Sequence, residues 1–192
     1  MLFPRCAAIL AGGKSSRMGR DKALLELDGE PLVRRAARVL SPLFERIVVV
    51  SNSPAIGDVA GVARIEDAQE NKGPLAGIEA ALSHFGEPTF VVACDMPFLN
   101  AAFIAFQREG WRDEFDALVP RSPHGDEPLH AIWSPRCLPT VRGALSQEKV
   151  PSLRRVLGEL SVSCIESEVV ARFDATFALF ENWNVPDDVR LT

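Results

Sequence analysis

The chain has 192 residues, a formal net charge of -5 at pH 7 and a hydrophobic content of 47%, which together predict a single packed domain over residues 1–192. The acidic balance, the absence of tyrosine and an aromatic content of 7% argue against a nucleic-acid partner. Its apolar runs are too short to span a membrane and its first residues do not form a signal peptide, so we expect a cytoplasmic protein with no membrane partner.

Apolar runs without polar alternation recur along the chain and are typical of strands covered on both faces. The predicted strands are Cys6–Leu10, Ile47–Val50, Phe90–Ala93 and Ala117–Val119, with Ala63–Glu66 as a shorter candidate. A first helix is predicted from about Pro31, a residue suited to the first helical position, to Leu40. A second begins near Pro74, and its apolar stripe is Leu75, Ile78, Leu82 and Phe85.

The C-terminal part continues with shorter elements. Leu129–Trp133 and Val162–Ile165 are predicted strands, and Arg136–Leu145 and Leu153–Leu160 are predicted helices. The alternation of strands and helices predicts an α/β domain with a mostly parallel sheet, right-handed crossovers and helices on both faces, which makes three layers. The four cysteines lie far apart and the three histidines lack metal-ligand spacing, so we expect reduced cysteines and no zinc site.

The loop after the first strand concentrates positive charge in an acidic protein. Four basic residues face one acidic residue, a local charge of +3; they are Lys14, Arg17, Arg20 and Lys22 against Asp21. Gly12 and Gly13 allow backbone N–H groups to approach an anion closely, so the loop predicts a phosphate site. Its spacing fits neither the P-loop nor the dinucleotide fingerprint.

An acidic residue follows another apolar strand at the edge where parallel sheets bind ligands. The block Cys94–Pro97 comes directly after Thr89–Ala93 and contains Asp95, and a lone carboxylate there needs a cation or hydrogen-bond donors. Mg²⁺ bridging triphosphate oxygens is such a cation, since it takes one or two carboxylates together with phosphate and water. The alternative is that Asp95 caps a helix, with Pro97 near the first turn.

Two further loops carry candidate ligand residues. Asp67 and Gly77 lie in the segment that leads into the second helix, which a plain loop-to-helix junction explains only in part. Asn52 lies just past the second predicted strand, where it is either a ligand residue or an ordinary turn residue.

The segment Leu10–Lys22, written L-A-G-G-x-S-x-R-M-G-x-D-K, resembles the signature of nucleotidyltransferases that use a nucleoside triphosphate as donor. Among these it is most similar to the molybdenum cofactor guanylyltransferases. The resemblance implies the Rossmann-like nucleotide-diphospho-sugar transferase fold, with a small antiparallel element in the C-terminal half. It also implies a nucleotide-binding half over about 1–100 and an acceptor-binding half over about 101–192.

The resemblance implies roles for individual residues. The donor nucleotide would contact Leu10, Ala11, Gly12, Gly13, Lys22, Asn52, Asp67, Gly77 and Asp95. Lys22, Arg17 and Asp95 would be catalytic, and Asp95 would hold Mg²⁺. Gly125–Ala131 resembles the family's segment before an acceptor-side strand. Asn182 and Asn184, in a closing N-x-N-x-P-x-D block, would face the acceptor, although a turn before a capped helix explains that block equally well.

The implied reaction is the transfer of GMP from GTP to the phosphate of a molybdopterin-type cofactor, with release of pyrophosphate. Molybdoenzyme apoproteins or other cofactor-biosynthesis proteins are the further partners that this reaction suggests. The alternatives are a cytidylyltransferase on the same cofactor, a sugar- or polyol-phosphate nucleotidyltransferase, and a non-catalytic carrier of the pterin cofactor. Cytidylyltransferases of this kind typically carry a second alanine in place of Gly12 and a D-Q-P block in place of Asp95-Met-Pro97, so the resemblance favours guanine over cytosine.

Overall fold

The computed structural model describes residues 3–12, 22–67, 69 and 72–183. The strands are β1 Cys6–Leu10, β2 Glu26–Leu27, β3 Glu30–Pro31, β4 Arg46–Val50, β5 Ala63–Ile65, β6 Thr89–Ala93, β7 Ala117–Ser122, β8 Gly125–Asp126, β9 His130–Trp133 and β10 Val162–Ile165. The α-helices are α1 Leu32–Leu40, α2 Pro54–Ala60, α3 Pro74–Phe85, α4 Ala101–Gly110, α5 Leu138–Leu145, α6 Leu153–Leu157 and α7 Ser167–Val170. Short 3-10 helices are η2 Lys22–Leu24, η3 Pro135–Cys137 and η4 Ala178–Phe180.

The main sheet has the strand order β10-β7-β9-β6-β1-β4-β5, and β8 pairs with β7. β1 lies near the middle and pairs in parallel with both β4 and β6. β9 runs antiparallel between β6 and β7, whereas β10 is parallel to β7. The prediction of a mostly parallel sheet with a small antiparallel element in the C-terminal half is therefore confirmed.

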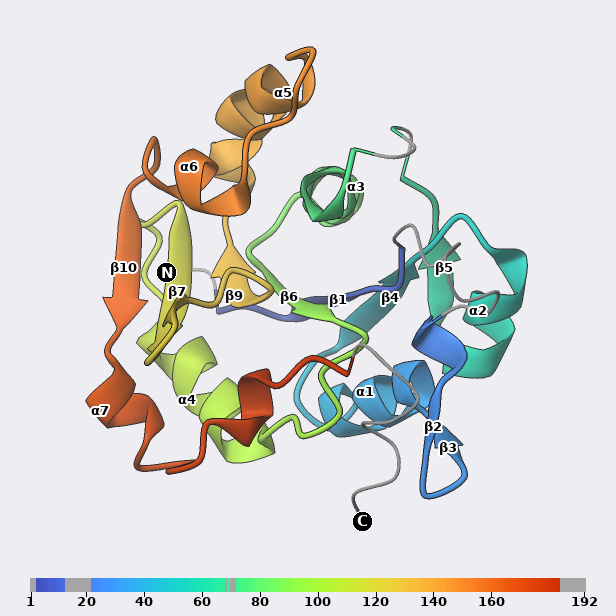
Figure 1. The fold of residues 1–192 in the computed structure, drawn as a ribbon. Helices are drawn as coiled ribbons and strands as arrows, with labels where there is room; N and C mark the ends of the chain where they lie inside the picture. The colour runs from blue at the N-terminus through green and yellow to red at the C-terminus, as the bar shows by residue number, and fades with distance from the viewer. Residues whose placement is uncertain (1–2, 13–21, 68, 70–71, 184–192) are drawn as a thin grey trace.

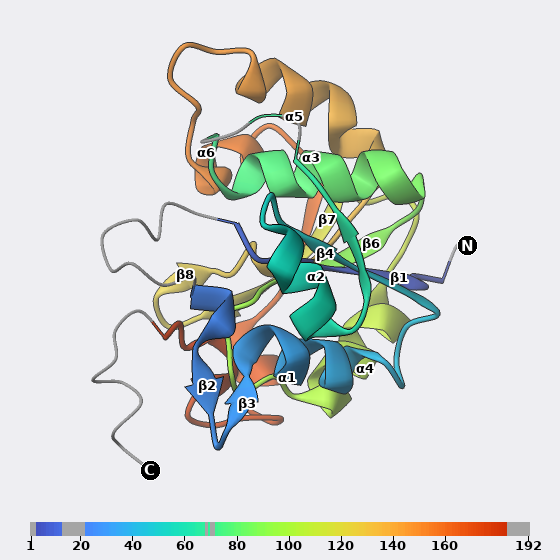
Figure 2. The ribbon, with the colours of Figure 1, turned by 90° about the vertical axis from the view of Figure 1, so that its right-hand side faces the viewer.

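Helices cover both faces of the sheet, with α3, α5 and α6 on one side and α1 and α4 on the other (Figure 1; Figure 2). β1 shows why its sequence is apolar throughout: Ala8 and Leu10 pack in the cluster with α3, whereas Ala7 and Ile9 pack in the cluster with α1. Successive side chains of a strand point to opposite faces, so a strand covered on both sides has no polar face. The predicted three layers are confirmed.

The predicted helices are present with shifted ends. α1 begins at Leu32 rather than at Pro31, which is its N-cap and also ends the β3 strand. α3 begins at Pro74 as predicted, and all four residues of its apolar stripe are buried. α6 ends at Leu157, three residues before the predicted end, because Gly158 caps it. Within the described residues, no helix combines the length and apolarity needed to cross a membrane.

Candidate functional site

The loops with the candidate residues follow strands that end at one edge of the sheet. Two hydrogen bonds hold the first residues of these loops together: Ala11 N–H donates to the Val50 carbonyl at 3.0 Å, and Cys94 N–H donates to the Leu10 carbonyl at 3.0 Å. This edge faces the viewer in Figure 1 and lies to the left in Figure 2. The ends of β1, β4 and β6 therefore place Gly12, Asn52 and Asp95 along one edge, where parallel sheets bind ligands.

Asn52 and Asp67 form a reciprocal pair across this edge. The Asp67 N–H donates to Asn52 Oδ1 at 3.1 Å, and Asn52 Nδ2 donates to Asp67 Oδ1 at 3.4 Å. The other carboxylate oxygen, Asp67 Oδ2, lies 3.9 Å from where a Cβ on Gly12 would stand. The structure thus brings together three candidate residues that belong to loops after β1, β4 and β5.

Gly77 has a packing role. It is a buried residue near the start of α3, where the helix lies against the sheet. A Cβ at this position would lie 3.0 Å from Leu10 Cδ2. A glycine at this position lets α3 lie close to the end of β1. Its contact with a nucleotide, and that of Leu10, stay predictions.

Asp95 lies in a turn after β6 and is partly exposed. The alternative that it caps a helix is wrong, because α4 begins only at Ala101 and its cap is Asn100, whose side chain accepts the Phe103 N–H. The Asp95 carbonyl accepts the Trp183 N–H at 2.9 Å, which brings the chain next to Asn182 to this turn. Asn182 itself is exposed.

Several candidate residues of the basic loop and of the C-terminal block lie outside what the structure describes. Gly13, Arg17 and Asn184 are not among the described residues, and of Lys22 only the backbone, at the start of η2, is described. Among the described residues, no group of three or more His, Cys, Asp or Glu side chains forms a metal site. Mg²⁺ needs no such group when a triphosphate supplies its other ligands, so the single Asp95 carboxylate at the sheet edge fits this ion.

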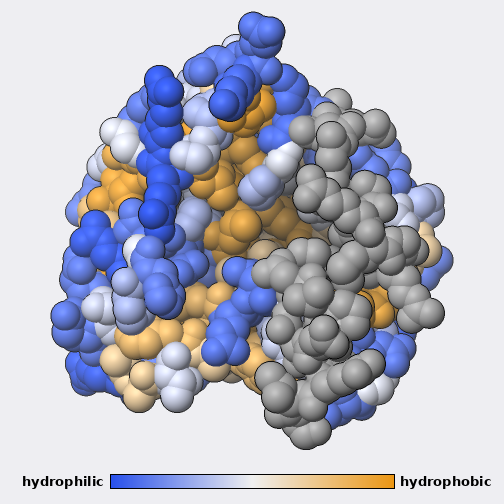
Figure 3. Space-filling view, viewed as in Figure 1, coloured by the Kyte–Doolittle hydropathy of each residue, from blue (hydrophilic) through white to orange (hydrophobic). Residues whose placement is uncertain are grey.

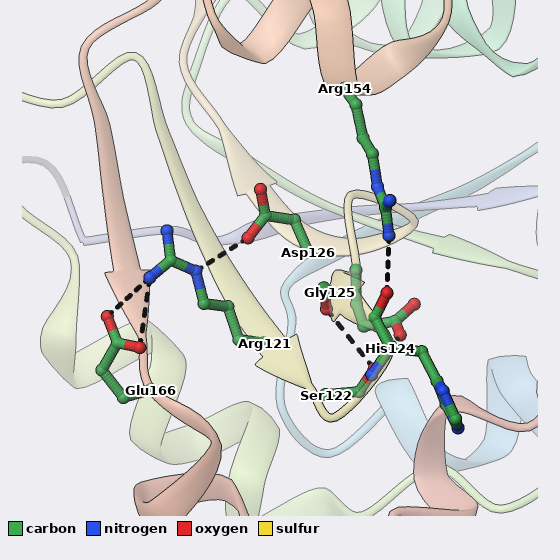
Figure 4. A network of polar contacts seen from close by, with 8 residues as sticks. Arg121, Ser122, His124, Gly125, Asp126, Arg154 and Glu166 are labelled. Atoms are coloured by element: carbon green, nitrogen blue, oxygen red, sulfur yellow. Dashed lines mark hydrogen bonds and ion pairs between the residues drawn. The ribbon is translucent and has the colours of Figure 1, made fainter.

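The edge is hollowed at its centre, and hydrophobic residues line the depth of the hollow (Figure 3). The β7–β8 hairpin lies beside it and is braced on two sides (Figure 4). Arg121 forms ion pairs with Asp126 at 2.9 Å and with Glu166 at 3.0 Å, and these hydrogen bonds raise its pKa. On the other side, Arg154 Nη2 of α6 donates to the His124 carbonyl at 2.8 Å. The predicted segment before an acceptor-side strand is thus a stiffened loop before β9.

Glu127 is a residue of this loop that the sequence analysis did not single out. It is half-buried, and Ser122 Oγ donates to its Oε1 at 2.6 Å. Burial raises the pKa of the carboxyl, and the Ser122 hydrogen bond opposes part of that shift. The motif Gly125–Ala131 marked the segment, but only the structure shows that Glu127 is paired with β7.

A family model described as the MobA-like NTP transferase domain matches residues 7–184. The chain belongs to this family. A probable molybdenum cofactor guanylyltransferase of Methanothermobacter thermautotrophicus is 35% identical over 195 residues, with 96% of each chain covered. A molybdenum cofactor guanylyltransferase of Desulfosudis oleivorans is 34% identical, with 94% of this chain and 90% of the relative covered. The resemblance drawn from the Leu10–Lys22 segment is therefore confirmed.

Two solved structures have the same fold as this chain. The crystal structure of molybdopterin-guanine dinucleotide biosynthesis protein A from Archaeoglobus fulgidus superposes with a TM-score of 0.82 at 29% identity, covering 96% of this chain and 94% of that one. A putative protein from Aquifex aeolicus VF5 superposes with a TM-score of 0.77 at 20% identity, covering 95% and 94%, and shows the likeness of fold.

Proposed function

We propose that this member of the MobA-like NTP transferase family transfers GMP from GTP to the terminal phosphate of a molybdopterin-type cofactor. The observation that carries the proposal is the convergence of Gly12, Asn52, Asp67 and Asp95 at one sheet edge. The names of the relatives supply the guanine nucleotide and the molybdenum cofactor.

The site divides between the two substrates. The loops after β1, β4 and β5 would bind the nucleotide, with Leu10, Ala11, Gly12 and Gly13 nearest the phosphates. Within the Asn52–Asp67 pair, Asn52 bonds to Asp67 Oδ1, and Asp67 Oδ2 lies toward Gly12, where it suits a ribose hydroxyl or a base N–H donor. The braced β7–β8 hairpin and Asn182, with Asn184 beyond the described residues, would bind the pterin acceptor across the hollow.

The chemistry needs positioning and charge neutralisation more than proton transfer. An oxygen of the acceptor phosphate forms a bond to the α-phosphorus of GTP, the bond between that phosphorus and the β-phosphate bridging oxygen breaks, and pyrophosphate leaves. The attacking phosphate is already ionised near pH 7, so no general base is required. Lys22 and Arg17 would neutralise the α- and β,γ-phosphates, and Asp95 would hold Mg²⁺, which adds positive charge where the leaving group forms.

The first experiment titrates GTP, CTP, ATP and UTP into the purified protein with and without Mg²⁺. We expect preference for GTP, and we expect the Mg²⁺-dependent part of the binding to be lost in Asp95→Asn. Turnover with the pterin acceptor, measured as pyrophosphate release, should fall by roughly 10²–10³ in that variant.

Glu109→Gln is the matched control, because Glu109 is an exposed carboxylate at the end of α4 and the variant removes the same charge. Asp95→Asn with normal turnover at limiting Mg²⁺ would show that Asp95 does not hold the ion. Preference for CTP would identify a cytidylyltransferase. Binding of the acceptor but of none of the four nucleotides, even with the acceptor present, would identify a carrier.

We further propose that the protein works in the cytoplasm and delivers its product to molybdoenzyme apoproteins or to other cofactor-biosynthesis proteins. The product of the proposed reaction would be a bulky dinucleotide in the hollow, which is open to solvent (Figure 3). Co-purification of tagged protein with such an apoprotein, dependent on the loaded product, is the expected result.

A further inference from the structure

Trp183 is the centre of a small apolar cluster that is separate from the two large cores. Its side chain is 6% exposed and packs with Leu27 and Leu32, with Phe98 and Leu25 packed against them. The large cores lie on the two faces of the sheet, whereas this cluster lies between the hairpin β2–β3, the start of α1 and the turn after β6.

Trp183 contacts the Asp95 turn at two points. Its backbone N–H donates to the Asp95 carbonyl at 2.9 Å. Its ring meets Phe98, three residues further along, edge to face with ring centroids 5.9 Å apart. Both the backbone and the side chain of one residue therefore hold the turn that carries the candidate Mg²⁺ ligand.

The same indole also contacts the segment that leads back to Lys22. Leu27 lies in β2, five residues after Lys22, and Leu32 begins α1. Leu32 N–H donates to the Leu25 carbonyl at 2.8 Å, which closes the hairpin on the helix. A second link comes from α1, where Arg35 Nε donates to the Pro97 carbonyl at 2.9 Å. Trp183 thus fills the space between the turn that carries the Asp95 carboxylate and the segment that begins at Lys22.

We propose that Trp183 is a positioning residue that sets the distance between the Asp95 turn and the η2–β2 segment, and so tunes the affinity of the site for Mg²⁺. The inference rests on the proposed function. In this proposal Trp183 acts through the Asp95 turn, which it holds by its backbone N–H and its ring. Groups that orient a metal ligand commonly change metal affinity by about 10–100-fold when they are removed. Among the described residues this cluster has three buried members, far fewer than either large core, so removal of Trp183 should loosen this part of the molecule most.

The test compares Trp183→Ala and Trp183→Phe with Phe180→Ala. Phe180 is the matched control because it belongs to the same C-terminal segment and is also 6% exposed, but packs with Phe103 and His130 in a large core. The readout is the Mg²⁺ concentration that gives half-maximal GTP binding. We expect it to rise about tenfold in Trp183→Ala, to return within about threefold of native in Trp183→Phe, and to stay within about twofold in Phe180→Ala.

A second measurement does not depend on whether the alanine variant folds. Replacing Trp111 and Trp133, both buried in the large cores, by phenylalanine leaves Trp183 as the only tryptophan. We expect its emission to change on addition of Mg²⁺ with GTP, with the same midpoint as binding, and to stay constant with GTP in EDTA.

Equal shifts of the Mg²⁺ midpoint in Trp183→Ala and Phe180→Ala would overturn the proposal, because they would reduce Trp183 to a general anchor of the segment. An unchanged Mg²⁺ midpoint in Trp183→Ala would overturn it as well, and so would a Trp183 emission that does not change on addition of Mg²⁺ with GTP. Absence of any Mg²⁺-dependent GTP binding in the native protein is a different result, since it contradicts the proposed function itself.

Discussion

Gly12 and Gly77 lie at the same edge but have different surroundings. Among the described residues, a Cβ on Gly12 would make an ordinary contact with Asp67, and the φ angle of Gly12 is outside the left-handed region. A Cβ on Gly77 would lie 3.0 Å from Leu10 Cδ2, and Leu10 is itself 7% exposed and packed in the core. The fold therefore needs a glycine at 77, whereas at 12 the need for a glycine would come from the ligand.

This contrast predicts opposite phenotypes for two alanine variants. Gly12→Ala should unfold at the same urea concentration as the native protein. It should bind GTP about tenfold more weakly, because the added Cβ would lie beside N–H groups that would contact phosphate. Gly77→Ala should lower the free energy of unfolding by about 1 kcal/mol, because crowding of Leu10 outweighs the gain in helix propensity. Urea denaturation and nucleotide titration measure both. A stable Gly77→Ala with weak GTP binding would instead place Gly77 in the nucleotide site.

The reciprocal pairing of Asn52 with Asp67 could not be derived from the sequence. The two residues are 15 positions apart, and their contact depends on the pairing of β4 with β5. The resemblance named both residues because it carries information about the ligand. Trp183 shows the converse: the N-x-N block drew attention to its asparagines, and nothing in the spacing indicates that the residue between them is buried.

At the scale of elements, the strands were the most predictable part. Strands covered on both faces form continuous apolar runs, and β1 has the predicted bounds. α2 escaped prediction because it has seven residues, only two of them buried, and a glycine in its middle. The hairpin β2–β3 has two residues per strand, too few for an alternation pattern to register. Helix α4 was also missed, although Asn100 is a favourable cap three residues before Phe103.

The β7–β8 hairpin gives a prediction at this scale. Gly125 has a φ of 117°, and a Cβ there would overlap Arg154 Nη2, which donates to the His124 carbonyl. Gly125→Ala should therefore destabilise the protein by about 1–3 kcal/mol, as strained backbone positions do.

Gly143→Ala provides the control for that variant, because Gly143 lies in α5 with open space around its Cα. It should stabilise the protein by roughly 0.5–1 kcal/mol. Urea denaturation compares the two, and equal midpoints for Gly125→Ala and the native protein would show that Arg154 moves aside without cost.

At the scale of the whole molecule, one buried histidine links stability to pH. His130 is completely buried among the rings of Phe90, Phe103 and Phe180, and within the described residues neither ring nitrogen has a hydrogen-bond partner. Burial lowers its pKa to about 4 from the ordinary value of 6.5. Between these pH values the unfolded chain takes up a proton that the folded chain does not. The contribution of His130 to the free energy of unfolding is therefore highest above pH 6.5 and falls as the pH drops toward 4.

The loss should reach about 3 kcal/mol at pH 4, from 1.36 kcal/mol per pKa unit. The raised pKa of Glu127 gives a slope of the opposite sign, so the useful quantity is the difference between the native protein and His130→Phe. We expect this difference in unfolding free energy to change between pH 6.5 and 4 and to be constant above pH 7. A constant difference throughout would show that His130 takes up its proton in the folded state at the same pH as in the unfolded chain.

The antiparallel β9 lies between two strands that point the same way, β6 and β7. The loop after β6 and the hairpin after β7 therefore lie at the same end of the sheet, separated by β9 (Figure 1). Under the proposed function, donor selectivity and acceptor selectivity are encoded in separate, modular stretches of chain. Exchange of residues 121–129 between relatives could then redirect the enzyme to a new acceptor while the nucleotide it consumes stays the same.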